Sequence, residues 1–341
     1  MGLSTFLVGL MPTTDQIGIA APICLVILRV MQGLAAGGEW AGAVLFAAEN
    51  APRSRRGLWS MFASLGAGVA VILAPATFLL VGLFMSDGTF ISWGWRLPFL
   101  TSLLLLGVGL WIRLAMDETP VFRAEAERGG IVRIPFAEAF RNQSREILLA
   151  GGMMMLTFCF GYLGIAYLPN YGTNILHLSR TFVLSMTVIA GFGYTGGILI
   201  SGLLSDCLGR RRVVIIAVLL GAVWSLVLFS LLDTGADATA YAVGVITTLS
   251  LAGAALGPLS AYLSELFETR YRYTAVGFAY NIASIVGGAI MPILGASVTA
   301  EYGARAFGYV LALLALISLV CALCLRETRG HELSGTVAGA D

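Results

Sequence analysis

Long apolar runs separated by short arginine-bearing loops constrain this chain more than any other feature. Runs of roughly twenty residues cross the ~30 Å hydrocarbon core of a bilayer as α-helices. Nine complete spans are predicted, at 19–47, 58–84, 95–115, 146–170, 181–204, 212–232, 240–264, 274–299 and 304–325. Charged residues make up only 11% of the chain, about half the share of an ordinary soluble domain. The sequence therefore predicts an all-α polytopic membrane protein.

The arginines fix an orientation for these spans. All twenty basic residues are arginine, and under the nine-span prediction sixteen lie in loops on one side and three on the other. The first set is Arg53, Arg55, Arg56, Arg113, Arg123, Arg128, Arg133, Arg141, Arg145, Arg210, Arg211, Arg212, Arg270, Arg272, Arg326 and Arg329; the second is Arg96, Arg180 and Arg305. Because cytoplasmic loops carry the basic excess, the first set and the C-terminus are predicted to be cytoplasmic, in the cell inner membrane.

An internal repeat divides the chain in two. Glu49 precedes Arg56 by seven residues, and Glu265 precedes Arg272 by the same spacing, 216 residues further along. A second pair of segments, MDETP and LRETR, closes the last span of each group. Parallel repeats of six spans are the architecture of one large class of transporters. The four repeated charges are expected to form ion pairs at cytoplasmic helix ends rather than to bind substrate.

The repeat also sets the expected domains. These are an incomplete N-terminal bundle at 1–115, a cytoplasmic linker at 116–145, a C-terminal bundle at 146–326 and a cytoplasmic tail at 327–341. Residues 1–11 are apolar but too short to span a bilayer. They are either an interfacial anchor or the second half of a helix, and the repeat favours a first bundle lacking two and a half helices. Within the linker, Phe136 and Phe140 lie one helical turn apart, which fits either a membrane-surface helix or an unstructured segment.

One charged island interrupts the apolar pattern of the second group. The stretch GLLSDCLGRRR resembles the cytoplasmic loop signature of the major facilitator superfamily, G-x-x-x-D-(R/K)-x-G-(R/K)-(R/K). The matching positions are Gly202, Asp206, Gly209, Arg210 and Arg211, while Cys207 stands where a basic residue is usual. The stretches GLMPTTDQIGIAAP, RVMQGLAAGGEWAGA, AAENAPRSRRG, DETPVF and SELFETRYRYT narrow the resemblance to the metabolite:proton symporter family, which includes shikimate, α-ketoglutarate, citrate and proline/betaine permeases.

The resemblance covers residues 1–330 and implies the major facilitator fold of two six-helix bundles. It also implies proton-coupled symport of a small organic acid or zwitterion by alternating access. An aspartate near the positive end of a neighbouring helix, or paired with arginine, can hold two bundles together in one state. We expect Asp206, Gly209 and Arg210 to form such a latch, whereas Arg212 is expected to be a topology marker only.

Arg29 is the one arginine predicted to lie well inside a span. A charge there is costly, so Arg29 is expected to face a cavity or a carboxylate, with Gln32 one turn away in the same surroundings. The resemblance implies that Arg29 helps to couple proton or substrate binding to conformational change. Glu39 fits either a buried acid or an ion pair at the helix end.

A substrate cavity is expected near the midplane, where the two groups meet. Polar and aromatic candidates for its lining are Tyr162, Tyr167, Asn170, Tyr262, Tyr280 and Asn281. Packing is at least as good an interpretation of each one alone. The implied partners are a small metabolite, a proton and the lipid bilayer, with no nucleic acid and a monomeric state.

Two other classes of function stay open at this point. A drug or metabolite antiporter of the same superfamily is disfavoured because its G-P-x-x-G-G signature is replaced here by ILAPATFLLVG. A truncated transporter remnant without activity is compatible with the incomplete first bundle. An enzyme is not indicated, since the sequence shows no nucleophile–base pair, metal-ligand cluster or cofactor motif, and the proton is the one coupling ion expected.

Overall fold

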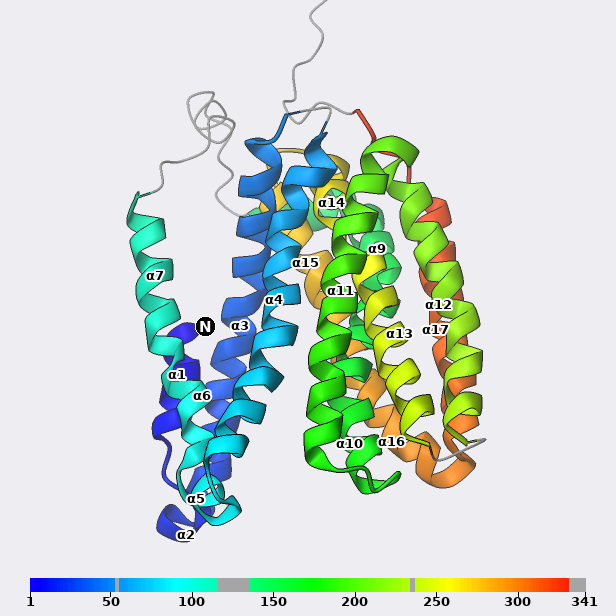
Figure 1. The fold of residues 1–341 in the computed structure, drawn as a ribbon. Coiled ribbons are helices and arrows are strands. Elements are labelled where there is room, and N and C mark those ends of the chain that lie inside the picture. Colours follow the sequence, from blue (N-terminus) through cyan, green and yellow to red (C-terminus); the bar gives the residue numbers. More distant parts are fainter. Residues whose placement is uncertain (53–54, 116–134, 234–236, 331–341) are drawn as a thin grey trace, which may run out of the picture.

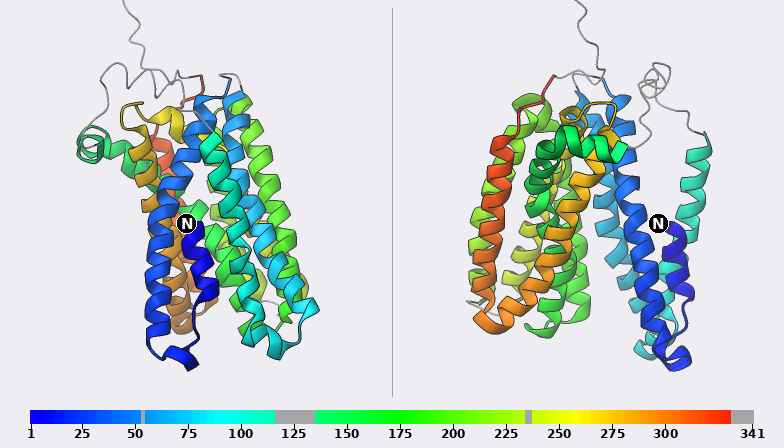
Figure 2. Two further views of the ribbon diagram at one scale, coloured as in Figure 1. Left: turned by 90° about the vertical axis from the view of Figure 1, so that its left-hand side faces the viewer. Right: turned by 180° about the vertical axis from the view of Figure 1, so that it is seen from behind.

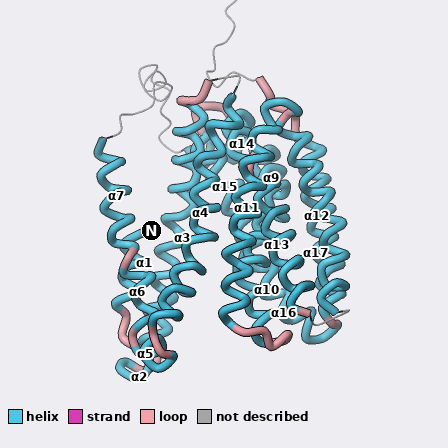
Figure 3. Tube along the Cα trace, viewed as in Figure 1, coloured by secondary structure: helices cyan, strands magenta, loops and turns pink. Residues whose placement is uncertain are grey.

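A computed structural model describes residues 1–52, 55–115, 135–233 and 237–330, and in these residues the regular structure is helical throughout (Figures 1 and 3). The predicted all-α fold is confirmed. Nine helices in the described ranges are long and apolar enough to cross a membrane: Ala20–Glu49, Arg56–Phe84, Gly94–Ile112, Glu138–Asn174, Arg180–Leu208, Arg210–Asp233, Ala238–Leu266, Arg272–Tyr302 and Ala304–Cys324. Each contains or overlaps one predicted span.

The helices form two groups that stand side by side (Figures 1 and 2). The first group consists of α1 (Gly2–Leu10), α2 (Thr14–Ile17), α3 (Ala20–Glu49), α4 (Arg56–Phe84), α5 (Asp87–Ser92), η2 (Gly94–Arg96), α6 (Leu97–Leu100) and α7 (Ser102–Ala115). The second consists of α9 (Pro135–Tyr162), η3 (Leu163–Tyr167), α10 (Leu168–Asn174), α11 (Arg180–Leu208), α12 (Arg210–Asp233), α13 (Ala238–Leu256), α14 (Leu259–Leu266), α15 (Arg272–Ala283), η4 (Ser284–Ile290), α16 (Met291–Tyr302) and α17 (Ala304–Cys324).

Residues 2–10 pack inside the first group. Helix α1 contacts α3, α6 and α7, and its Ser4 and Val8 are buried. At the adjoining turn, the Arg96 guanidinium donates to the Met11 carbonyl at 3.1 Å. The interfacial-anchor interpretation is therefore wrong, because α1 buries one face against its own neighbours.

The start of α9 differs from the predicted span. Residues 135–142 are helical and join the span through Gln143, whose φ of −133° bends the helix. Figure 2 shows this first part of α9 turned across the end of the second group. Phe140 packs edge-on against Phe278 of α15, with ring centroids 5.0 Å apart. The side chain of Phe136 lies outside the described residues.

Glycines set the closest helix approaches in the second group. Helix α13 passes α11 so closely that a Cβ at Gly253 would overlap the carbonyl of Tyr194. Small residues of this kind let membrane helices approach and pack where lipid supplies no hydrophobic driving force. The tight pair α11–α13 forms a firm support for the charged end of α11.

Candidate functional site

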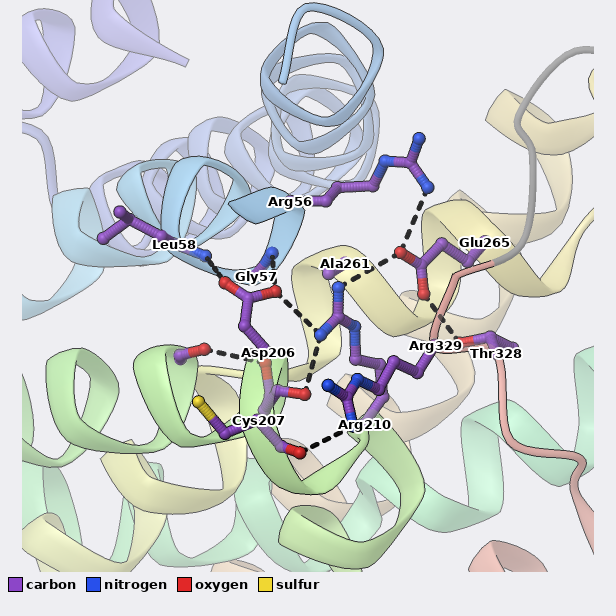
Figure 4. Close-up of polar contacts among 12 residues, drawn as sticks. Arg56, Gly57, Leu58, Asp206, Cys207, Arg210, Ala261, Glu265, Thr328 and Arg329 are labelled. Carbon is purple, nitrogen blue, oxygen red and sulfur yellow. Dashed lines mark hydrogen bonds and ion pairs between the residues drawn. The ribbon is translucent and has the colours of Figure 1, made fainter. Parts of the chain in front are cut away.

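Asp206, near the end of α11, caps a helix of the other group. Its Oδ1 accepts a hydrogen bond from the Gly57 amide and its Oδ2 from the Leu58 amide, both at 2.9 Å (Figure 4). Those amides open α4, where unpaired N–H groups give a helix a partial positive charge. A Cβ at Gly57 would lie 2.8 Å from Asp206 Oδ1 and 2.5 Å from Ser205 Oγ. Position 57 therefore has no room for a side chain.

Arg210 joins two carboxylates beneath this cap. Its Nη1 lies 2.8 Å from Asp206 Oδ1 and its Nη2 lies 3.3 Å from Glu265 Oε1. Nη1 also donates to the Ser205 carbonyl at 2.7 Å. Arg210 is 1% exposed, and a buried guanidinium is tolerated only when its charge is paired. The geometry thus fixes Arg210 between α11 and α14.

Glu265, on α14, collects contacts from three parts of the chain. Its Oε1 lies 3.2 Å from Nη1 of Arg56, which opens α4, as well as within reach of Arg210. Its Oε2 accepts from the Thr328 hydroxyl at 2.8 Å. The Glu265 side chain is fully buried. Two guanidiniums therefore converge on one carboxylate at the meeting of the two helix groups, as Figure 4 shows.

The ion pairs expected at the repeated charges are present, but they cross between the groups. Glu49 of α3 lies 3.4 Å from Arg272 of α15, and Glu265 of α14 pairs with Arg56 of α4. Each glutamate thus meets the arginine of the other repeat. We use the name charge network for this set: Glu49, Arg56, Asp206, Arg210, Glu265 and Arg272.

Gly209, Arg211 and Glu327 build the turn that presents Arg210. Gly209 has a φ of +102°, a backbone conformation that residues other than glycine rarely adopt. Glu327 accepts from the amides of Arg210 and Arg211 at 2.8 and 3.1 Å, which caps α12. The Arg211 guanidinium donates to the carbonyls of Ala322 and Leu323. Arg211 therefore braces the second group internally, and the capping role of Glu327 was not foreseen from its place in the repeat.

Helices α4 and α11 stay in close contact beyond the charge network. A Cβ at Gly202 would overlap the Met61 sulfur, and one at Gly191 would lie 2.7 Å from Ile72. The Thr195 hydroxyl, which faces Gly68, donates to the Gly191 carbonyl of its own helix at 2.8 Å. The Ser205 hydroxyl likewise donates to the carbonyl of Gly202 at 2.7 Å.

The segment between α14 and α15 is fixed by its own hydrogen bond. Tyr271 donates to Oε2 of Glu268 at 2.7 Å. Burial, together with that carboxylate, raises the pKa of Tyr271 to about 12. Arg272, the next residue, donates to the Phe267 carbonyl at 3.0 Å and to the Thr269 hydroxyl at 3.0 Å within the same segment.

Arg29 lies away from the charge network, on the middle of α3. Its Nη1 donates to Gln32 Oε1 at 3.2 Å, and Gln32 Nε2 donates to the Thr5 hydroxyl of α1 at 2.7 Å. Gln32 is buried and Arg29 is exposed. Within the described residues no carboxylate contacts Arg29, so the expected carboxylate partner is replaced by an amide. Glu39 is half-exposed and lies 3.5 Å from the Met1 amino group, which excludes the buried-acid interpretation.

The six predicted cavity residues do not gather at one place. Tyr262 is fully buried, and its hydroxyl donates to the Arg326 carbonyl at 2.7 Å. It lies three residues before Glu265 on α14, so its assignment to a midplane cavity is wrong, because it packs beside the charge network. Tyr167 bonds with Thr299 at 2.9 Å, and Asn170 bonds with Asn174 of the same helix α10.

The other three candidates lie around α15. Tyr280 stacks on Trp40 of α3, with ring centroids 4.6 Å apart. Tyr162 lies against Gly288, where a Cβ would come within 2.5 Å of its ring. Asn281 donates to the Gly277 carbonyl of its own helix at 2.7 Å. Tyr280 is thus the one member of the six for which the structure records a contact between the two groups among the described residues, and its partner Trp40 was not singled out.

Two groups of membrane-spanning helices joined at one end by a breakable charge network are expected in a transporter whose two bundles move against each other. The sequence comparisons agree with that class. A family profile described as Major Facilitator Superfamily matches residues 1–275 and 149–340. The chain belongs to this superfamily of transporters.

The chain is also similar to individual transporters of known sequence or structure. The Escherichia coli inner membrane metabolite transport protein YhjE is 38% identical over 338 residues, which cover 98% of this chain and 77% of that protein. The Escherichia coli shikimate transporter is 32% identical over 96% of this chain and 76% of its own length. The Escherichia coli proline/betaine transporter is 29% identical over 100% and 70%. Among solved structures, the proton:xylose symporter XylE bound to 6-bromo-6-deoxy-D-glucose superposes with a TM-score of 0.74 at 17% identity, covering 98% of this chain and 80% of that one, which is a likeness of fold.

Proposed function

We propose that this chain is a proton-coupled symporter of a small organic acid or zwitterionic metabolite that works by alternating access. The observation that carries the proposal is the charge network, in which Asp206 of one helix group caps α4 of the other. A transporter that rocks two bundles about a central site needs a closure at one end that can break. The names of the shikimate and proline/betaine relatives support this substrate class.

In the proposed mechanism the charge network is the cytoplasmic latch. The excess of arginine at this end supports a cytoplasmic location, with the C-terminus on the same side. The structure then corresponds to the state in which the cytoplasmic end is closed. Opening requires Asp206 to leave the Gly57 and Leu58 amides, and Arg56 and Arg272 to leave their glutamates.

Arg29 and Gln32 are the proposed coupling residues. Their hydrogen-bonded chain runs from α3 to Thr5 on α1, so a carboxylate that reaches Arg29 would pull on two helices at once. An organic acid or the carboxylate of a zwitterion supplies such a group. Glu39, three turns further along α3, is the proposed second member of this path. The proton is the coupling ion and no cofactor is required. The domain limits at 115, 145 and 326, and a monomeric state, belong to the same proposal.

Uptake into proteoliposomes tests the proposal. Purified protein is reconstituted, an inwardly directed proton gradient is imposed, and labelled shikimate and proline serve as probes of the two substrate classes. Accumulation that a protonophore abolishes is expected for one class. Accumulation driven instead by an outwardly directed proton gradient would indicate the antiporter, and no uptake of either class by folded protein would indicate a non-transporting remnant.

A further inference from the structure

A second contact between the two helix groups lies deeper than the charge network. The ring of Trp40 on α3 stacks on Tyr280 of α15, with centroids 4.6 Å apart and ring planes inclined by 32°. Trp40 lies nine residues before Glu49, and Tyr280 lies eight residues after Arg272. At 1.5 Å per helical residue the stack is therefore ~12–14 Å further along these helices than the Glu49–Arg272 pair.

The stack is anchored more firmly on one side than on the other. Phe158 of α9 meets Tyr280 edge-on, with centroids 4.7 Å apart and planes at 87°. Both Phe158 and Tyr280 belong to the second group, so Tyr280 keeps this neighbour whatever the first group does. The ring contact recorded for Trp40 in the described residues is the one with Tyr280. Separation of α3 from α15 would therefore leave Tyr280 in place and carry Trp40 away.

A second aromatic residue of α15 also contacts α3. Tyr273 donates to the Gly38 carbonyl of α3 at 2.9 Å, and a Cβ at Gly42 would lie 3.6 Å from its ring. Gly38 and Gly42 flank Trp40 in the sequence, but the Tyr273 side chain is exposed. The large rings of Trp40 and Tyr280 are both half-buried, so they fill the interface from its inner side.

From this geometry we infer that Trp40 and Tyr280 form an inner gate of the transport pathway, separate from the cytoplasmic latch. The gate is a close, tilted pair of aromatic rings, one from each group. It closes the α3–α15 interface at the depth where the charge network no longer reaches. That the rings lie in a transport pathway rests on the proposed function, whereas their stabilisation of the closed state does not.

Distance measurement between spin labels tests the gate without substrate. In protein whose five cysteines have been replaced, labels are placed at Asn50 and Arg212, which are exposed ends of the first and second groups. Trp40→Leu keeps an apolar side chain but removes the stack. An aromatic pair contributes about 0.5–1.5 kcal/mol, so the separated population should rise about two- to tenfold. Trp40→Phe should restore most of the closed population.

A matched control and a second variant keep the result decisive. The Trp59 ring contacts Phe62 of its own helix α4 in a tilted arrangement, with centroids 6.1 Å apart, so Trp59→Leu should leave the distance distribution unchanged. Tyr280→Leu should reproduce the shift, and the double variant should add little to either single one, because both remove the same contact. An unchanged distribution in Trp40→Leu, or a full sum of effects in the double variant, would overturn the inner gate. The expected distance shifts, in a parent protein that takes up neither labelled probe, would count against the proposed function and leave the aromatic closure standing.

Discussion

Two of the interfaces that join the helix groups, α3–α15 and α4–α14, are related by the internal repeat, yet they are closed by different means. In the α3–α15 interface, Glu49 meets Arg272, and Trp40 stacks on Tyr280 further in. In the α4–α14 interface, Glu265 meets Arg56, and the hydroxyls of Ser64 and Ser260 bond at 2.7 Å further in. Arg56 corresponds to Arg272 in the repeat, and Ser64 then corresponds to Tyr280.

The charged ends differ as much as the inner contacts. Helix α4 begins against Asp206 and Arg210, whereas Arg272 at the start of α15 donates to the nearby Phe267 carbonyl and Thr269 hydroxyl. The α4–α14 interface is therefore held mainly by buried charge, and the α3–α15 interface by one ion pair, the Tyr273–Gly38 hydrogen bond and aromatic area. A change of protonation or of charge weakens the contacts between charged groups but not the contact between the aromatic rings. The two interfaces can therefore be weakened separately.

The largest effect is expected from Glu265→Gln. Two guanidiniums, Arg56 and Arg210, would lose their shared anion, and removing one partner from a buried ion pair costs about 3–5 kcal/mol. The melting temperature in detergent should fall and the Asn50–Arg212 label distance should lengthen. Asp233→Asn, which breaks the exposed pair with Arg305, is the control and should change neither. A normal distance distribution in Glu265→Gln would show that the closure does not depend on this carboxylate.

Asp206→Asn should free the start of α4 from α11 with less loss of stability. A hydrogen bond to a charged group contributes about 1.5–3 kcal/mol, and the neutral amide still accepts from one backbone N–H. The separated population should rise more than tenfold, and proton-driven uptake should fall.

The control for Asp206→Asn is another capping aspartate. Asp237 accepts from the Thr239 amide at the start of α13, within the second group. Asp237→Asn removes a helix cap without touching the interface, so it should leave the label distance as in the parent protein. Equal effects of the two variants would mean that Asp206 acts through helix capping alone.

Glu49→Gln should have a smaller effect than Asp206→Asn, because the Trp40–Tyr280 stack still holds the same interface. A cost of about 1.5 kcal/mol, at the lower end of the range for a hydrogen bond to a charged group, or roughly a tenfold rise in the open population, is expected. Combining it with Trp40→Leu should exceed either change alone. Glu138→Gln, in the exposed pair with Arg270, provides the comparison. An effect of Glu49→Gln as large as that of Asp206→Asn would refute the asymmetry between the interfaces.

Ser64→Ala should have the smallest effect. Polar contacts between membrane helices average about 0.6 kcal/mol, so the open population should at most triple. The measurement is again the label distance, with Ser185→Ala, an exposed hydroxyl bonded to its own helix, as reference. A shift matching that of Trp40→Leu would show that the serine pair is as important as the aromatic stack.

Local patterns predicted the spans and the placing of Asp206 at the positive end of a neighbouring helix and beside an arginine, because hydrophobic length and the spacing of charges decide these. The crossing of the ion pairs was beyond the sequence, since Glu49 and Arg272 are 223 residues apart and Glu265 and Arg56 are 209 apart. Tyr262 was misplaced because a tyrosine in an apolar run is equally suited to a cavity or to packing beside a buried charge. Trp40 was missed because nothing in its own helix distinguishes an aromatic residue that meets the other group.

The hydroxyls that α11 turns toward α4 have a consequence for how fast the two groups can part. Thr195 and Ser205 satisfy their hydrogen bonds on carbonyls of α11 itself, so sliding or separating α4 leaves neither of them unpaired. This surface of α11 packs closely against glycines and alkyl groups of α4, but these two hydroxyls form no hydrogen bond to α4 that must break when the groups part. Resistance to motion then lies outside this α4–α11 surface, mainly at the charged end and at the aromatic pair, and the rate of opening should respond to those two places more than to Thr195 or Ser205.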